Sequence, residues 1–201
     1  MPITNIAAAR RWAWTLGITS MTFPTFETER LVLRELTVDD AEHVFGFFSD
    51  PEVMQFYDCE AFTKVEEAKA LIRRFCQWFA NENGFRLGIA LKPEPRIVIG
   101  TCGLFGWHKQ ARQATLGYEL SRSYWRRGLM TEAVRALLDH AFHNLELNRV
   151  RATVVTANVA SAKLLERLSF QKEGLLREAQ FVNGKFDDLF SYALLRKEWA
   201  P

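Results

Sequence analysis

The segment from Gly117 to Ala133 constrains the fold of this chain more than any other. Its first residues, up to Leu120, predict a strand, and a basic loop containing Gly128 follows. Apolar residues at helical spacing then predict an amphipathic helix from about Leu129 to Asn144. The segment therefore places a row of free backbone N–H groups at a helix start.

The loop before this helix carries the features of an anion site. Arg126 and Arg127 add positive charge, Thr131 adds a hydroxyl, and Gly128 tolerates unusual dihedrals and close approach. Converging N–H donors at a helix start suit a pyrophosphate, which carries about two negative charges. An ordinary strand–helix connection with solvated arginines is the alternative that the loop alone leaves open.

Size and charge limit the classes of protein that the chain can belong to. Its 201 residues, 48% of them hydrophobic, favour one domain with a substantial core, which we expect over residues 21–201. A formal net charge of +2 gives no argument for nucleic-acid binding. Because no apolar run approaches the ~20 residues of a membrane span, we expect no membrane association.

Residues 1–20 form a separate stretch. Arg10-Arg11 and the short apolar run after them resemble a signal sequence only faintly, because no small-residue cleavage site follows. We expect an N-terminal extension outside the native fold, with Met21 as the functional start. A short added helix is the alternative.

The cysteines and histidines show no metal or disulfide pattern. Cys59, Cys76 and Cys102 are odd in number, and we interpret them as reduced core or near-core thiols of a cytoplasmic protein. His140 and His143 have helical spacing but no further ligand, so we expect a packed or solvated pair and no metal site.

The order of predicted elements gives the fold class. It runs strand, two helices, three strands, helix, strand, helix and two strands, which indicates a mixed α/β fold with a largely antiparallel sheet and one parallel crossover. We expect Pro51 to end the first helix, a capping box over residues 63–66 to begin the second, and Asn183-Gly184 to form the last hairpin turn. The other expected strands and helices span residues 30–36, 85–91, 96–105, 113–120, 149–156 and 160–168.

A second segment makes the ligand more specific. The segment from Asn158 to Gly174 follows a predicted strand and opens a helix, as the segment around Gly128 does. The chain carries a series of motifs in order: Thr28-Glu29-Arg30-Leu31, Gly117-Tyr118-Glu119-Leu120, Tyr124-Trp125, Thr131-Glu132-Ala133, Asn158 with Ser161, Leu164 to Phe170, Arg177-Glu178, Asn183-Gly184 and Leu194 to Trp199. With these motifs the chain resembles the GNAT superfamily of N-acetyltransferases, most closely the branch of the ribosomal-protein N-terminal acetyltransferases.

The resemblance implies a GNAT fold and a place for acetyl-CoA. Backbone groups of Glu119, Leu120 and Ser121 would pair with the pantetheine amides like an added strand. Asn158 would bond the pantetheine arm where the next strand splays away, although it is also a good helix N-cap. The main-chain amides of the loop and helix start would hold the pyrophosphate: Arg126, Arg127, Gly128, Leu129, Met130 and Thr131.

Three positions depart from the family pattern. Met130 replaces the usual glycine or alanine, so its side chain must point away from the phosphates into the core. Trp125 stands where glutamine or arginine is common, and Ser169 replaces the glycine before Phe170. We expect binding through the backbone to survive these changes.

The chemistry implied is direct attack of a neutral amine on the thioester in a ternary complex. Glu119 is the first candidate for the general base, with solvent exposure or a salt bridge as the alternative, and Glu178 is the second. The tyrosine that many GNAT enzymes place seven residues after the asparagine is Leu165 here. The branch suggests Ser161 instead, hydrogen-bonding the CoA sulfur, although a first-turn serine also satisfies the backbone.

The acceptor is the least constrained part of the prediction. The resemblance favours the N-terminus of a protein, such as a ribosomal protein, as the acceptor. Small amines and a CoA-binding module without catalysis stay open as alternatives, and so does a homodimer. Aromatic residues near the first helix pair are expected to be mostly core, with some lining the acceptor pocket, among them Phe45, Phe47, Phe48, Phe56, Tyr57 and Trp78. Trp107-His108-Lys109 is predicted to be a turn near the acceptor.

Overall fold

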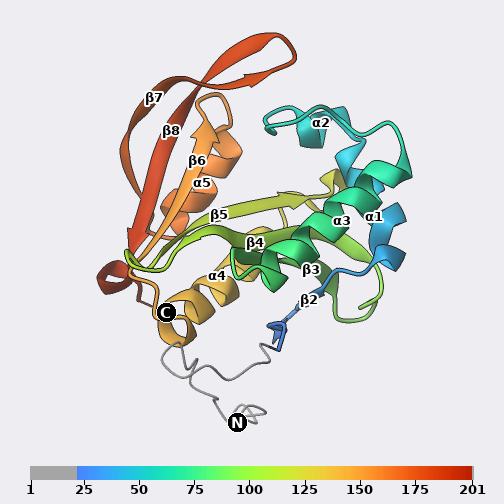
Figure 1. Ribbon diagram of the computed structural model, residues 1–201, viewed down its shortest axis with the longest axis horizontal. Coiled ribbons are helices and arrows are strands. Elements are labelled where there is room, and N and C mark those ends of the chain that lie inside the picture. The colour runs from blue at the N-terminus through green and yellow to red at the C-terminus, as the bar shows by residue number, and fades with distance from the viewer. Residues whose placement is uncertain (1–21, 201) are drawn as a thin grey trace.

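The computed structural model describes residues 22–200, and one mixed sheet forms its centre (Figure 1). The spatial order of the eight strands is β1-β2-β3-β4-β5-β6-β8-β7. All neighbouring strands are antiparallel except β5 and β6, which are parallel as predicted. The strands are β1 Phe26–Glu27, β2 Leu31–Glu35, β3 Gly84–Leu91, β4 Val98–His108, β5 Gln113–Leu120, β6 Arg149–Val155, β7 Gln171–Val182 and β8 Lys185–Leu195.

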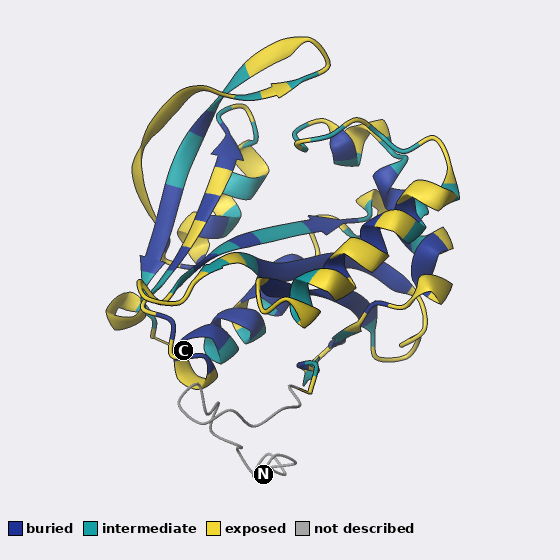
Figure 2. Cartoon of the chain, in the orientation of Figure 1, coloured by how far each residue is buried: buried dark blue, intermediate teal, exposed yellow. Residues whose placement is uncertain are grey.

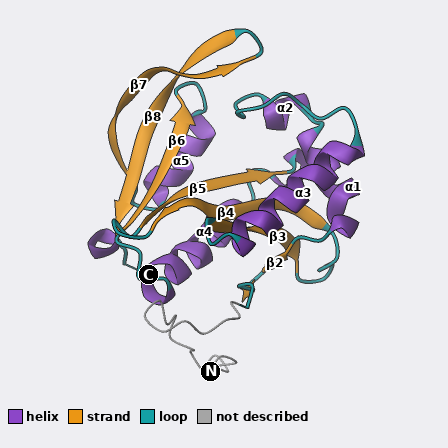
Figure 3. Cartoon of the chain, in the orientation of Figure 1, coloured by secondary structure: helices purple, strands orange, loops and turns teal. Residues whose placement is uncertain are grey.

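Helices cover both faces of the sheet (Figure 3). Buried residues of α1 and α3 form one apolar cluster with Val98 of β4, while α4 and α5 pack into a larger cluster on the strands. The central strands are buried, and β7 at the sheet edge is largely exposed (Figure 2). The helices are α1 Ala41–Phe48, α2 Pro51–Met54, α3 Val65–Ala80, α4 Leu129–Asp139 and α5 Val159–Arg167.

Several helix ends differ from the prediction. Pro51 does not only stop α1; it occupies the first turn of α2, a position where its missing N–H costs nothing. The helix predicted to reach Asn144 ends as α4 at Asp139 and continues as a π-helical turn over His140–Asn144. The wider turn keeps Ala141 and Phe142 buried together.

Two local predictions need correction. The box at the start of α3 uses Glu67 rather than Glu66, since the Glu67 carboxylate accepts from the N–H groups of Thr63 and Lys64 at 2.8 and 2.9 Å. Trp107 and His108 belong to β4, and the turn begins only at residue 109, so the predicted turn starts two residues too early. The Asn183-Gly184 hairpin is confirmed, with φ of 52° and 74°.

The sheet opens between β5 and β6. Their parallel pairing covers only Gln113–Thr115 against Arg149–Arg151, although β5 runs on to Leu120 and β6 to Val155. Beyond that pairing the strands separate, and β6 continues beside the long β7–β8 hairpin (Figure 1). The separation leaves main-chain groups at the centre of the sheet without a neighbouring strand.

Within residues 22–200, no helix has both the length and the apolar character that crossing a bilayer requires. The expectations for residues 1–20 lie outside the described part of the chain.

Candidate active site

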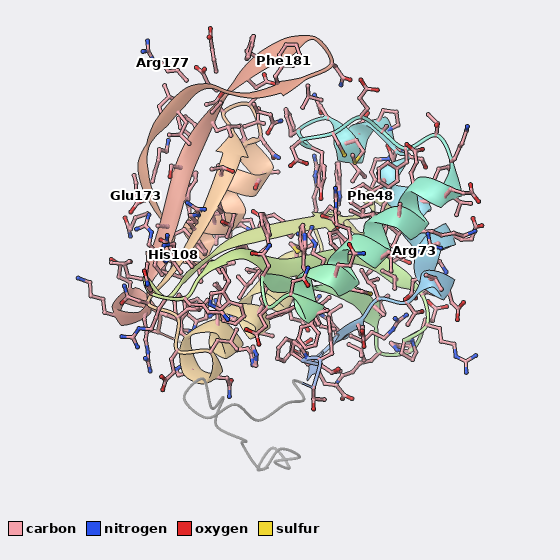
Figure 4. The ribbon with its side chains drawn as sticks, in the orientation of Figure 1. Phe48, Arg73, His108, Glu173, Arg177 and Phe181 are labelled. Carbon is pink, nitrogen blue, oxygen red and sulfur yellow. The ribbon has the colours of Figure 1, made fainter. Side chains whose placement is uncertain are left out.

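The opening between the strands leads into a cavity of about 790 Å³. Its wall combines β5, the loop and first turn of α4, the end of β6 and the start of α5. Residues from α2 and the loop after it contribute, as does Gln180 of β7. Figure 4 labels Phe181 on the β7–β8 hairpin and Phe48 at the end of α1, neither of which lines the cavity.

The loop before α4 has the geometry expected of an anion site. Gly128 is the N-cap residue, with φ of 74° and ψ of 0°, a left-handed conformation that glycine adopts without strain. Arg126 is also left-handed, with φ of 60°. Leu129, Met130 and Thr131 form the first turn, whose N–H groups have no intrahelical acceptor. This helix start therefore presents donors and a positive dipole end to the cavity.

An ion pair from Arg30, directly before β2, holds this loop in place. Arg30 Nη2 lies 2.6 Å from Glu132 Oε2 in the first turn of α4, and Arg30 Nη1 donates to the Arg127 carbonyl at 3.0 Å. Glu132 Oε1 also accepts from the Arg30 N–H at 2.9 Å and from the Thr28 hydroxyl. Burial alone would raise the pKa of Glu132, but these hydrogen bonds outweigh burial and lower it.

The main chain of β5 faces the cavity at alternate residues. Ser121 N–H donates to the Ile99 carbonyl at 2.8 Å, so Ser121 and Glu119 turn their main-chain groups toward β4. Tyr118 and Leu120 turn theirs toward the opening. Among the three residues predicted to pair with a pantetheine arm, only Leu120 has this orientation. Its carbonyl accepts from the Trp125 indole N–H at 2.6 Å.

The start of α5 brings polar groups to the opposite wall. Asn158 caps the helix, its Oδ1 accepting from Ser161 N–H at 3.0 Å, and both residues also line the cavity. The Ser161 hydroxyl lies 2.7 Å from the hydroxyl of Tyr118 on β5. Burial raises the pKa of Tyr118 above its ordinary value, although the Ser161 contact opposes this, so the phenol stays protonated. The two walls therefore meet through a pair of hydroxyls.

A buried polar cluster surrounds Glu119. The side chains of Glu119 and Arg86 are each 3% exposed and form an ion pair, and Thr101 donates to the other Glu119 oxygen. Arg86 Nε donates to Thr101 Oγ1 at 2.6 Å, and Tyr57 donates to Glu119 at 3.3 Å. The salt bridge that the sequence left as an alternative for Glu119 is present.

The protonation of this cluster depends on its burial. Removal from water raises the pKa of Glu119, while the charge of Arg86 and the hydrogen bonds from Thr101 and Tyr57 oppose that rise. Burial likewise raises the pKa of Tyr57 well above its ordinary value, helped by the Glu119 charge. Glu119, Arg86 and Tyr57 all line the cavity, so a carboxylate with increased proton affinity lies in its wall.

A hydrogen bond crosses the cavity on the side of α2. Gln180 Nε2 of β7 donates to the main-chain carbonyl of Tyr57 at 3.1 Å. Acidic residues Glu52 and Asp58 and the aromatic residue Phe56 line the same side. This bridge joins two segments that are 123 residues apart in the sequence.

Most of the predicted site residues line the cavity, and some do not. Met130 is 7% exposed and packs into the core, as expected. Ser121 and Arg127 are absent from the wall; the Arg127 guanidinium lies over the Tyr124 ring at 5.4 Å. The predicted residues found in the wall are Glu119, Leu120, Arg126, Gly128, Leu129, Met130, Thr131, Asn158 and Ser161.

The remaining candidates lie elsewhere. Glu178, the second candidate base, is exposed on β7 and outside the cavity, and its N–H donates to Asp188 at 2.8 Å. Burial lowers the pKa of His140 to about 4. Cys102 is buried and Cys59 half-buried, but Cys76 is exposed rather than near the core. The described residues contain no group of three or more metal-ligating side chains.

Sequence reasoning missed four residues of the site. Arg86 was detectable, because it interrupts an otherwise apolar strand and a buried charge needs a partner. The other three have ordinary local contexts, and only the fold brings Thr101 to Glu119 and brings Tyr118 and Gln180 to the cavity. Phe56 and Tyr57, two of the aromatic residues named for the acceptor region, line the cavity, but the contact of Tyr57 with Glu119 was not expected.

The sequence is similar to those of known proteins. Residues 30–171 match the acetyltransferase (GNAT) domain family. The chain is 39% identical to the "Uncharacterized N-acetyltransferase p20" of Bacillus licheniformis over 88% of this chain and 98% of the relative. It is 28% identical to the [ribosomal protein uS5]-alanine N-acetyltransferase of Escherichia coli over 54% of this chain and 57% of that enzyme.

A solved structure supports the same fold. The crystal structure of an acetyltransferase (GNAT family) from Bacillus anthracis superimposes with a TM-score of 0.77 at 22% identity, covering 87% of this chain and all of that one. The splayed sheet, the helix start and the sequence matches agree. The chain therefore belongs to the GNAT acetyltransferase family and is an acyltransferase, with ribosomal-protein N-acetyltransferases among its relatives.

Proposed function

We propose that the protein transfers an acetyl group from acetyl-CoA to a primary amine by direct attack in a ternary complex. The observation that carries this proposal is the cavity at the sheet opening. A left-handed Gly128 and the free N–H groups of α4 lie in its wall together with the buried carboxylate of Glu119. A diphosphate-bearing thioester and an amine need these two features in one cavity.

The residues fit the chemistry of the thioester. The N–H groups of Leu129, Met130 and Thr131 would hold the diphosphate, with Arg126 adding charge. The main chain of Leu120 and the side chain of Asn158 would hold the pantetheine arm. When bound, acetyl-CoA supplies an activated acyl carbon and a thiol leaving group.

Glu119 is the proposed proton acceptor. An amine must lose a proton on attack, and a carboxylate whose pKa is raised by burial suits that role. Arg86 and Thr101 already donate hydrogen bonds to the two Glu119 oxygens, and Tyr57 donates to one of them. The amine proton would therefore reach the carboxylate on the side of Tyr57, either directly or through a water molecule. Ser161 is proposed to donate a hydrogen bond to the departing sulfur from the opposite wall.

The leading acceptor is a protein N-terminus. The relative from E. coli is named for an alanine of ribosomal protein uS5, and it matches over about half of each chain. A small cationic amine is the second candidate, because Glu52 and Asp58 line the acceptor side and the Gln180–Tyr57 bridge crosses it. Both acceptors present a primary amine.

Two measurements test the proposal. Calorimetry with CoA and acetyl-CoA should show binding, and its absence at millimolar ligand would refute the proposed cofactor. A panel of N-terminal peptides and small amines, followed by detection of released thiol, then identifies the acceptor class. Turnover of peptides but not of small amines supports the leading acceptor, and the reverse result supports the second.

A further inference from the structure

Two hydroxyls from different walls of the cavity are in contact. The Tyr118 hydroxyl on β5 lies 2.7 Å from Ser161 Oγ in the first turn of α5, and 3.5 Å from the Ser161 carbonyl. We propose that Tyr118 is a positioning residue that donates to Ser161 and turns the serine proton toward the CoA sulfur. This inference rests on the proposed function.

The direction of the hydrogen bond follows from the surroundings. A hydroxyl has one proton and two acceptor positions, so only one of the pair can donate to the other. Tyr118 packs against the apolar core, where burial keeps its phenol protonated. If its proton goes to Ser161 Oγ, the serine proton must point elsewhere. Ser161 lines the cavity, and the cavity is where a thiol would lie.

Tyr118 also explains the missing tyrosine on α5. Leu165, which stands where a tyrosine is common in the family, is fully buried in the core and offers no hydroxyl. A phenol instead reaches the first turn of α5 from the neighbouring strand. Tyr118 also lines the cavity, but its nearest polar contact is the Ser161 hydroxyl, which its proton can reach at 2.7 Å. The serine therefore transmits its effect.

The step that this pair would assist is loss of the thiol. The amine nitrogen forms a bond to the acyl carbon, the carbon–sulfur bond breaks, and its electron pair stays on sulfur. The amine proton goes to Glu119, and the thiolate accepts a hydrogen bond from Ser161 until solvent protonates it. A polarised serine hydroxyl stabilises that thiolate better than an isolated one does.

The test measures the thiol of bound CoA rather than turnover alone. The ultraviolet absorbance of the thiolate, titrated in the complex of CoA with the full chain, gives the thiol pKa. Ser161→Ala and Tyr118→Phe should each raise this pKa by about one unit, the scale of one hydrogen bond to a charge. The double variant should raise it no further, since Tyr118 acts through Ser161.

Kinetics give an independent readout. Tyr118→Phe should lower kcat about tenfold and leave the KM for acetyl-CoA unchanged, because the hydrogen bond strengthens as charge develops on sulfur. Tyr192→Phe is the matched control. Tyr192 is also buried, and its hydroxyl lies 3.2 Å from Glu166 Oε1. Because Tyr192 does not line the cavity, neither the thiol pKa nor kcat should change in Tyr192→Phe.

Each outcome has one meaning. If Ser161→Ala shifts the thiol pKa but Tyr118→Phe does not, the inference is overturned and the proposed function stays intact. Additive shifts in the double variant also overturn it, because they show independent action. If neither variant shifts the thiol pKa, neither hydroxyl acts on the thiol, and the inference is overturned. Failure of the wild type to bind CoA overturns the proposed function itself.

Discussion

Arg30, directly before β2, and Glu132 of α4 form an ion pair with Nη2 and Oε2 2.6 Å apart, and Arg30 also donates to the carbonyl of Arg127. The pair joins the sheet to the loop whose N–H groups line the cavity. Arg30 therefore turns the Arg127 carbonyl away from the cavity and leaves the donors of the loop facing it.

Arg30→Gln should weaken CoA binding about five- to tenfold, because the loop loses its fixed conformation. Calorimetry measures this, and the acceptor KM should not change. Lys92→Gln is the control, since Lys92 pairs with Glu27 at 3.6 Å near the same edge and outside the cavity. Equal losses of affinity in the two variants would show a general effect of charge.

Glu119→Gln should lower both activity and stability. Loss of the base should reduce kcat at least a hundredfold. The variant also leaves the buried Arg86 charge unpaired, which should reduce the free energy of unfolding in urea by about 3–5 kcal/mol. The double variant Arg86→Gln/Glu119→Gln separates the two effects. Stability should return in it while kcat stays low; recovery of kcat as well would make Glu119 a structural residue.

Gln180→Ala removes the hydrogen bond across the acceptor side of the cavity. The acceptor KM should rise about fivefold, the scale of one neutral hydrogen bond, with CoA affinity unchanged. Gln171→Ala on the same strand is the control, because Gln171 is exposed and outside the cavity wall. An acceptor KM equal to that of the wild type would show that the bridge has no part in acceptor binding.

His140 predicts how stability depends on pH. Its pKa is lowered by burial from 6.5 to about 4, so the unfolded chain binds a proton between these values and the folded chain does not. The contribution of neutral His140 to the free energy of unfolding is fully present above pH 6.5. It falls by about 3 kcal/mol as the pH drops to 4. Urea unfolding of His140→Gln should show a flatter profile across this window, and identical slopes would contradict the assignment.

Local patterns predicted the fold because its elements are locally encoded. The alternation over residues 113–120 matches β5 at both ends, and Asn183-Gly184 adopts the two positive φ values that favour this pair of residues in hairpins. The helix ends were harder to predict. The π-helical turn at His140–Asn144 places Phe142 in the core, as an α-helical turn also could, so the apolar periodicity does not distinguish the two.

The loop that lines the cavity before α4 could be predicted from local sequence, whereas the polar cluster around Glu119 could not. The loop residues from Arg126 to Thr131 are contiguous, so one stretch of sequence contains the whole arrangement. Glu119 contacts Arg86 and Tyr57, which lie 33 and 62 residues away. No local pattern encodes such a pairing, and it appears only when β3 and β5 lie on either side of β4.

The early end of the pairing between β5 and β6 has a consequence for the whole molecule. An extended ligand seated there would complete the hydrogen-bond ladder, so occupancy and folding are thermodynamically linked. On the proposed function this ligand is acetyl-CoA, and the melting temperature of the protein should then follow its concentration. Depletion of acetyl-CoA in a cell would shorten the lifetime of the folded enzyme as well as slow its reaction, because the open end of β5 would lose its partner.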